Sequence, residues 1–222
     1  MREQQNYSLG QTTAARSESS AVLRNTYGLL ALTLAFSGVV AYFSQQMNMP
    51  HPGIMLTLVG FYSLFFLTMK LRNSGWGLLT TFALTGFMGY TLGPILNMYM
   101  SMSNGASVIS SAFAMTAFVF TGLSAYVLIT RKDMSFLNGF ITVGFFVLLA
   151  AVIASFIFDI SGLQLAISAG FVLFSSAMIL FQTSAIIQGG ERNYIMATIS
   201  LYVSIYNLFL SLLSILGFAS ND

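Results

Sequence analysis

Hydroxyl and amide side chains recur at helical spacing in the last third of the 222-residue sequence. Five of them follow one another at intervals of three or four residues: Ser200, Ser204, Asn207, Ser211 and Ser214. Three more lie seven residues apart in the apolar stretch before them: Ser168, Ser175 and Gln182. Residues three, four and seven apart share one face of a helix, so each set predicts a polar stripe along one helix.

Two uses of these stripes stay open. Facing stripes can join two membrane helices by hydrogen bonds, each worth about 0.6 kcal/mol on average. They can also line a wettable pathway between the helices. We favour the first use, and we call the eight residues the polar seam.

The residues that catalysis, metal binding or ion coupling would need are missing. The sequence has no Cys and a single His, His51, which excludes thiolate chemistry, iron–sulfur clusters and multi-histidine metal sites. None of the long apolar stretches contains Asp, Glu, Lys or Arg, whereas intramembrane proteases and ion-coupled carriers need such groups. We therefore expect no enzymatic activity, no cofactor and no metal site. The eight Lys and Arg residues form no basic face, which argues against a nucleic-acid partner.

The elements that position the polar seam are membrane helices. Hydrophobic residues make up 56% of the chain and charged residues only 6%, against roughly 25% charged residues in a soluble domain. Seven apolar stretches are each long enough to cross a bilayer, and their length favours helices over barrel strands. They cover residues 26–43, 53–69, 76–100, 106–130, 136–158, 163–187 and 194–218. The sequence therefore predicts an all-α fold, a polytopic membrane protein whose residues 25–222 form a bundle of seven transmembrane helices in a lipid bilayer.

Residues 1–24 are polar, with charges of both signs, and predict a disordered tail. The basic residues all fall in this tail or in the loops on its side of the membrane: Arg2, Arg16, Arg24, Lys70, Arg72, Arg131, Lys132 and Arg192. Because basic loops stay in the cytoplasm, we expect a cytoplasmic N-terminus and a periplasmic C-terminus. No basic residue follows the last stretch, so charge alone leaves open whether that stretch crosses fully or re-enters.

The third stretch contains Gly89 and Gly93, four residues apart, followed directly by Pro94. The two glycines allow another backbone to approach closely. Pro94 offers no N–H to the carbonyl of Tyr90, which favours a kink. These three residues are a candidate hinge for gating. The alternative, which we favour, is a packing contact with a bend.

Several segments resemble a known family. Residues 85–97 (TGFMGYTLGPILN), residues 130–137 (TRKDMSFL) and the last apolar stretch are similar to the Bax inhibitor superfamily of seven-span membrane proteins. A proteobacterial branch of that superfamily is more similar still. The segments that carry this closer resemblance are residues 22–27, 32–37, 124–128, 200–204 and 211–220.

The resemblance implies a location and a role. Proteins of that branch lie in the bacterial inner (cytoplasmic) membrane, associate with the ATP-dependent protease FtsH and its membrane partner complex, and restrain its degradation of membrane proteins. The resemblance thus implies a modulator of the protease that acts by protein–protein association. One route is that the protein is itself a slowly degraded substrate and so competes with other substrates. Other members leak calcium under pH control through two buried aspartates, whose positions hold Gln182 and Ser204 here. The alternative is therefore an ion (calcium) leak channel that lacks the acidic pH-sensing pair.

Overall fold

The computed structural model describes residues 2–158 and 162–220 of the chain, with side chains from residue 18 onward. Every regular element in these ranges is an α-helix, and each helix contains a segment long and apolar enough to cross a membrane. The prediction of an all-α bundle of seven transmembrane helices is therefore confirmed. The helices are α1 (Arg2–Gln46), α2 (Gly53–Leu71), α3 (Trp76–Met100), α4 (Gly105–Thr130), α5 (Leu137–Ile157), α6 (Leu163–Ile187) and α7 (Tyr194–Ala219).

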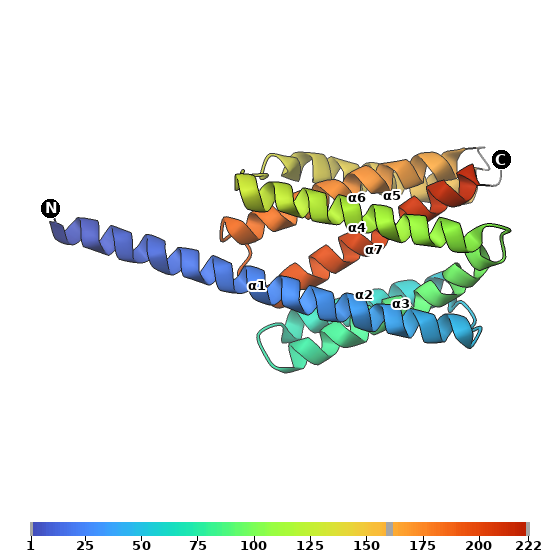
Figure 1. The fold of residues 1–222 in the computed structure, drawn as a ribbon, viewed down its shortest axis with the longest axis horizontal. Coiled ribbons are helices and arrows are strands. Elements are labelled where there is room, and N and C mark those ends of the chain that lie inside the picture. Colours follow the sequence, from blue (N-terminus) through green and yellow to red (C-terminus); the bar gives the residue numbers. More distant parts are fainter. Residues whose placement is uncertain (1, 159–161, 221–222) are drawn as a thin grey trace.

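Helix α7 is the central element of the bundle. It packs against α1, α3, α4 and α6, and Figure 1 shows it crossing between the group α1–α3 and the group α4–α6. In its most apolar segment 56% of the residues are buried, against 6% in α2 and in α5. The helix continues unbroken for 26 residues toward the end of the bundle opposite the N-terminus. Its length and apolar composition suffice for a full crossing.

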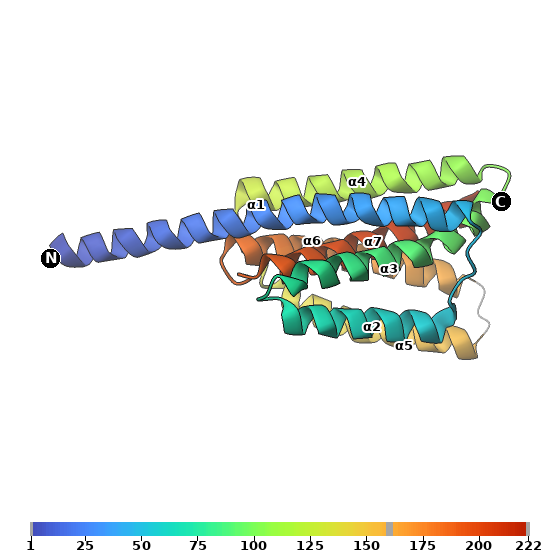
Figure 2. The same cartoon turned by 90° about the horizontal axis from the view of Figure 1, so that it is seen from below.

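The other helices form layers around α7. Seen as in Figure 2, α1 and α4 lie on one face of the bundle and α2 and α5 on the opposite face, with α3, α6 and α7 between them. Helix α2 packs chiefly on α3, and α5 chiefly on α6. Since α2 and α5 have so little buried surface, most of their apolar side chains must face lipid.

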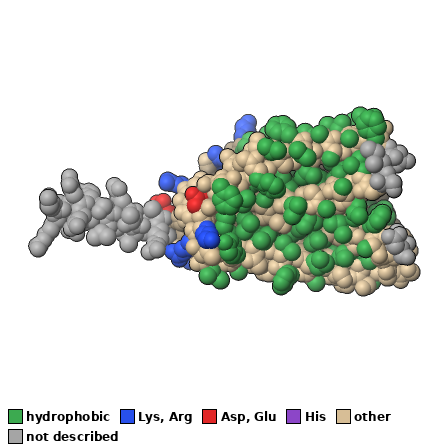
Figure 3. All heavy atoms as spheres, turned by 90° about the horizontal axis from the view of Figure 1, so that it is seen from above, with side chains coloured by type: hydrophobic (Ala, Val, Ile, Leu, Met, Phe, Trp, Pro, Cys, Tyr) green, Lys and Arg blue, Asp and Glu red, His purple; other side chains and the backbone are tan. Residues whose placement is uncertain are grey.

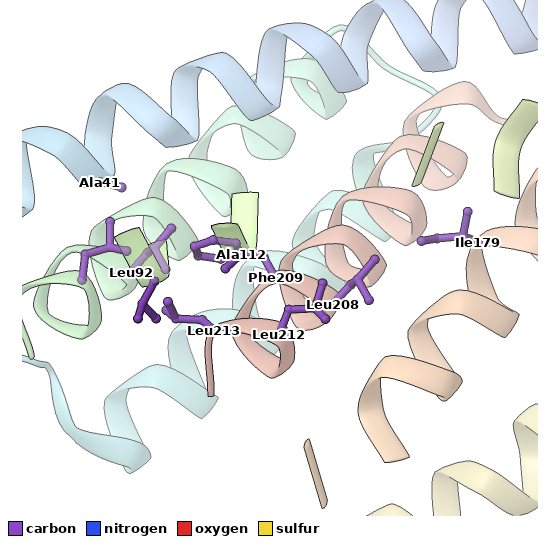
Figure 4. Close-up of a cluster of buried hydrophobic side chains, with 10 residues drawn as sticks. Ala41, Leu92, Ala112, Ile179, Leu208, Phe209, Leu212 and Leu213 are labelled. Atoms are coloured by element: carbon purple, nitrogen blue, oxygen red, sulfur yellow. The ribbon is translucent and has the colours of Figure 1, made fainter. Parts of the chain in front are cut away.

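The largest buried cluster joins five helices, mostly in the half of the bundle away from the basic end. Figure 4 shows its side chains gathered around α7, with Ala41 reaching in from α1 and Ile179 from α6. Its buried members are Ala41, Leu92, Leu96, Val108, Ala112, Ile179, Leu208, Phe209, Leu212 and Leu213. The core therefore holds α7 in place by dispersion contacts from every neighbouring helix.

Helix α1 begins well before the apolar stretch that predicts it. Residues 18–24, which we expected to belong to a disordered tail, are helical, and Val22 and Leu23 pack against a buried cluster around Tyr202. A helix already nucleated in the membrane extends at low cost into polar sequence that lacks proline, because each added residue gains a hydrogen bond. The backbone of residues 2–17 also belongs to α1, and the side chains of residues 1–17 lie outside the described part of the chain.

Charged side chains gather at one end of the molecule. Figure 3 shows the Lys and Arg side chains at one end of the molecule, while hydrophobic side chains cover the length of the helices. In Figure 1 the N-terminal part of α1 projects at that same end. Lys70 and Arg72 end α2, Arg131 ends α4, and Arg192 lies in the turn between α6 and α7. We call these three connections the basic turns. The structure thus reproduces the charge separation that the sequence predicts between the two ends.

Candidate functional site

The two halves of the polar seam belong to α6 and α7, which pack side by side. One contact joins them directly, because the hydroxyl oxygens of Ser168 and Ser214 are 3.0 Å apart. Two of the other serines bond within their own helix. Ser204 donates to the carbonyl of Ser200 at 2.8 Å, and Ser211 donates to that of Asn207 at 2.7 Å. Within the described residues, the interhelical bonding that we favoured thus joins the stripes at this single pair.

The two positions that hold aspartates in calcium-leaking members are neutral and buried. The Gln182 side chain is 8% exposed and that of Ser204 is 4% exposed. The Ser175 hydroxyl, about two turns along α6 from Gln182, is also buried and has no hydrogen-bond partner in the described structure. This inner half of the polar seam therefore contains neutral groups at tight packing positions.

The outer half of the polar seam borders open space. A cavity of about 480 Å³ lies between α5, α6 and α7, and polar side chains that line it include Gln164, Ser168, Asn207, Ser211 and Ser214. A second cavity of about 350 Å³ shares Gln164 and Ser214 with it. Asn207 is near the midpoint of α7. The polar lining therefore runs from the end away from the basic turns to about half the depth of the bundle.

The candidate hinge residues Gly89 and Gly93 pack against the backbone of α1. A Cβ atom at Gly89 would collide with the carbonyl oxygen of Ser37, and one at Gly93 would collide with the side chain of Ser44. The GxxxG spacing on α3 thus brings two helix backbones into contact, as such a motif does in membranes. The structure places both glycines in a packing contact, and the gating hinge stays a prediction.

Pro94 is accommodated by a hydrogen bond from another helix. Its missing N–H leaves the carbonyl of Tyr90 without an intrahelical donor, and the Ser44 hydroxyl of α1 donates to that carbonyl at 2.9 Å. One turn further on, the Asn97 side-chain amide donates to the carbonyl of Gln45 at 3.0 Å. Because these bonds join α3 to α1 on both sides of the proline, α3 continues as one helix to Met100.

Two tyrosines of α7 form contacts that our reading of the sequence missed. The Tyr202 side chain is 1% exposed, and its hydroxyl bonds to the Ser37 hydroxyl and lies 3.3 Å from the carbonyl of Thr85. The Tyr206 hydroxyl, one turn along, is 3.1 Å from that of Thr91. The sequence contained a signal for these contacts. Tyrosines usually lie at the membrane interfaces, and a tyrosine hydroxyl buried inside the membrane needs a hydrogen-bond partner. A Tyr pair four residues apart near the middle of a span indicates contacts to other helices.

The turn between α6 and α7 ties the basic turns together. On one side, the Ser184 hydroxyl donates to the carbonyl of Lys132 at 3.1 Å and accepts from the backbone N–H of Met134 at 3.0 Å. The Gln188 side chain donates to the carbonyl of Arg131 at 3.0 Å. These bonds fix the α4–α5 turn to the end of α6.

On the other side, Asn193 connects the same turn to the end of α2. Its side-chain nitrogen is 3.2 Å from the carbonyl oxygen of Arg72 and 2.9 Å from the side-chain oxygen of Asn73. Its side-chain oxygen accepts from the first amides of α7 and so caps that helix. The three basic turns therefore form one hydrogen-bonded surface with exposed cationic side chains.

His51 lies in the turn between α1 and α2. Its Nδ1 accepts a hydrogen bond from the backbone N–H of Gly53 at 3.0 Å, at the start of α2. Among the described residues, no group of three or more His, Asp or Glu side chains could hold a metal ion. His51 thus has a local structural contact at a helix start.

The structure is that of a seven-helix membrane protein. Its central helix is buried among the other six, and its described interior is neutral. The model of the family described as "Inhibitor of apoptosis-promoting Bax1" matches residues 19–221, and the chain belongs to this Bax inhibitor family. The family resemblance predicted from the sequence is therefore confirmed.

Named relatives narrow the comparison. The chain is 58% identical over 201 residues to "Modulator of FtsH protease YccA" of Escherichia coli K12, which covers 90% of this chain and 91% of that protein. It is 76% identical over 222 residues to an uncharacterized protein of Pseudomonas aeruginosa, with 100% of both chains covered. An uncharacterized membrane protein of Vibrio cholerae is 43% identical over 206 residues, with 92% of each chain covered. The likeness thus extends through all seven helices.

Proposed function

We propose that this protein modulates the membrane-bound, ATP-dependent protease FtsH by associating with it and its membrane partner complex in the bacterial inner membrane. The observation that carries the proposal is the 58% identity to the E. coli modulator of FtsH over 90% of the chain. Identity at this level over nearly the whole chain implies the same fold and a similar surface, which supports a similar partner. The protein would restrain degradation of membrane proteins and would itself perform no chemistry.

The neutral interior supports association over transport or catalysis. The described membrane helices hold buried hydroxyls and one buried amide, that of Gln182, at the positions where proton relays and carriers place ionisable groups. The structure instead offers a fixed polar surface at the basic turns. Since ATP is consumed in the cytoplasm, that end must face inward for the surface to meet the protease. A fusion test checks this orientation, because a periplasm-active reporter should work after Asp222 and fail after Lys132.

The N-terminal part of α1 is the segment we propose the protease engages when the protein acts as a slow substrate. It projects from the bundle at the end where the basic turns lie (Figures 1 and 2). Deleting residues 2–17 should lengthen the half-life in a pulse-chase measurement in cells that contain the protease. Equal half-lives for both forms, with the full-length protein visibly degraded, would show that this segment is not the handle.

The main test reconstitutes the full-length protein with FtsH in liposomes that contain a membrane substrate and ATP. Modulation predicts slower substrate loss with this protein than with an equal amount of an unrelated seven-helix protein, together with co-purification of the two from mild detergent. An unchanged degradation rate and no co-purification would contradict the proposal.

A second candidate function is a leak of ions, and the cavity of about 480 Å³ along the outer half of the polar seam favours it. Dye-loaded liposomes that contain the protein alone separate the two functions. A calcium influx above that of empty liposomes, reduced by Asn207→Leu in the cavity lining, would favour the channel. A calcium flux equal to that of empty liposomes would contradict the ion leak and leave modulation of the protease as the proposed function.

A further inference from the structure

A groove opens between α1 and α4, with residues of α3 and α7 as its floor. Its volume is about 680 Å³. In Figure 1, α7 is visible between α1 and α4 along the line of this groove. The wall helices approach each other where the rings of Tyr27 and Phe120 lie 6.1 Å apart. From that contact the groove runs toward the end of the bundle away from the basic turns.

The lining of the groove is mostly apolar, and its buried tyrosine hydroxyls, those of Tyr202 and Tyr206, are bonded within the protein. Leu34, Gly38 and Ala41 line it from α1, and Ile109, Phe113 and Ala117 from α4. Its threonines and serine on α4 donate to carbonyls of their own helix at 2.7 to 3.0 Å: Ser110, Thr116 and Thr121. The lining includes no charged residue. An occupant must therefore be apolar over most of its length.

The length of the groove matches one leaflet of a bilayer. Its lining spans residues 34–45 of α1 and 106–121 of α4, or about 17 and 23 Å at a rise of 1.5 Å per residue. Half of a hydrocarbon core of roughly 30 Å is about 15 Å. A partner's transmembrane helix would need about 30 Å of length and, at a diameter of 10 Å, a cylinder of roughly 2,400 Å³. The groove is too short and too small to hold such a helix.

The surroundings of the groove are lipid-facing. Val39 on α1 is 53% exposed and Phe118 on α4 is 79% exposed, and both are apolar. Inside a bilayer, a groove bordered by such side chains opens sideways onto acyl chains. An empty groove would deprive its lining of dispersion contacts, and water gains nothing from an apolar wall. Lipid is the fluid that can fill it.

We propose that this groove binds one acyl chain of a membrane phospholipid, drawn from the leaflet at the end away from the basic turns. The methyl end of the chain lies near the contact between Tyr27 and Phe120. The headgroup lies at the open end, beside the neutral side chains of Gln45 and Met100. Without a cation at that end, the site recognises the hydrocarbon chain and does not select an anionic headgroup. The acyl chain completes the packing between α1 and α4.

The test uses photo-labelling of the full-length protein in nanodiscs made with a phosphatidylcholine whose acyl chain carries a diazirine near its methyl end. Irradiation followed by mass spectrometry of chymotryptic peptides locates the label. We expect labelling within residues 34–45 and 106–121 to exceed that on α2 and α5, whose apolar side chains contact bulk lipid.

A filling variant sharpens the test. A Cβ atom at Gly38 would meet no other atom within 4 Å, so Gly38→Phe places its ring in the groove without displacing a helix. Gly28→Phe is the matched control, since Gly28 lies on the same helix with equally open space but outside the lining. Labelling of the groove should fall to the level of α2 and α5 in Gly38→Phe and stay unchanged in Gly28→Phe.

Three results would overturn the proposal. One is groove labelling equal to that of α2 and α5 in the unaltered protein. Another is labelling that persists in both Gly38→Phe and Ala117→Phe. The Ala117→Phe variant fills the groove from the opposite wall, and it alone decides this test if Gly38→Phe aggregates. The third is a photoreactive amino acid at position 38 that cross-links in cells to a second protein instead of to lipid, which would assign the groove to a partner helix.

Discussion

The side of α7 that faces α1 and α3 is bound by hydrogen bonds that cross between helices. Tyr202 reaches Ser37 on α1, and Tyr206 reaches Thr91 on α3. Helices α1 and α3 are themselves joined where Ser44 supplies the donor that Pro94 withholds. Each of these bonds breaks when the helices separate, so each resists their separation.

The side of α7 that faces α6 is different. One bond crosses to α6, between Ser168 and Ser214. The buried serines of α7, Ser204 and Ser211, donate instead to carbonyls one turn earlier in their own helix. Such bonds survive when the helices move apart. Open space lies on this side as well, in the cavity between α5, α6 and α7.

The contrast teaches that polar residues in a membrane bundle hold helices together only where their bonds cross an interface. Helices α1, α3 and α7 are joined by such bonds, and we expect separation of helices to begin on the α6 side. The following substitutions test that division, from the largest expected effect to the smallest.

Gly93→Leu should have the largest effect, because its side chain would meet Ser44 and the backbone of Gln45. Overpacking of a well-packed core typically costs about 1 to 3 kcal/mol, and a backbone contact leaves little room to relax, so we expect about 3 kcal/mol or more. The midpoint of thermal aggregation, followed by size-exclusion chromatography in detergent, measures the loss. Gly122→Leu on α4 is the control, since a Cβ there meets nothing within 4 Å. Equal losses for the two variants would show that the close α1–α3 contact at Gly93 tolerates a larger side chain as well as an open position does.

Ser44→Ala should come next. It leaves the carbonyl of Tyr90 without a donor in an apolar setting, and an unsatisfied buried acceptor costs about 1 to 3 kcal/mol. The same chromatographic midpoint should fall by less than in Gly93→Leu. In the double variant with Pro94→Ala, an amide returns to the Tyr90 carbonyl, and the loss should shrink. A loss that does not depend on residue 94 would contradict this account of the bond.

These two positions show how far the sequence could predict the structure. The spans at residues 76–100 and 163–187 coincide with α3 and α6, because the hydrocarbon thickness sets the length of an apolar run. The unpaired carbonyl before Pro94 was predictable from the chain, since proline chemistry is local. Its donor, Ser44, was not, because only the packing of α1 on α3 decides which of several serines lies there.

Neither the helical structure before residue 25 nor the hydrogen-bond partners of the polar seam could be predicted from the sequence, for related reasons. Polar composition predicts a disordered tail through residue 24, but the packing of Val22 on a distant part of the chain continues the helix through residues 18–24. Spacing predicts which face carries the serines. It carries no information on whether a hydroxyl proton goes to a neighbouring helix or back to its own.

Tyr202→Phe should have an intermediate effect. It removes the bond to Ser37 and the contact with the Thr85 carbonyl while keeping the ring in place. Hydrogen bonds between membrane helices average about 0.6 kcal/mol and reach about 1.7 kcal/mol, so we expect a loss of about 1 kcal/mol. A double-mutant cycle with Ser37→Ala isolates the pair. Additive losses would mean that this bond contributes nothing to holding α1 against α7.

Ser204→Ala should have the smallest effect and is the strictest test of the contrast. The residue is buried like Tyr202, at 4% against 1% exposure, so burial alone predicts similar losses. Its hydroxyl, however, bonds to the carbonyl of Ser200 in its own helix, and that carbonyl keeps its normal helical N–H donor when the hydroxyl is removed. We expect a change below about 0.5 kcal/mol, within the range of a neutral surface substitution. A loss as large as that of Tyr202→Phe would mean that the α6 side is held as firmly as the α1–α3 side, because the alanine would then have removed an interaction that crosses to α6.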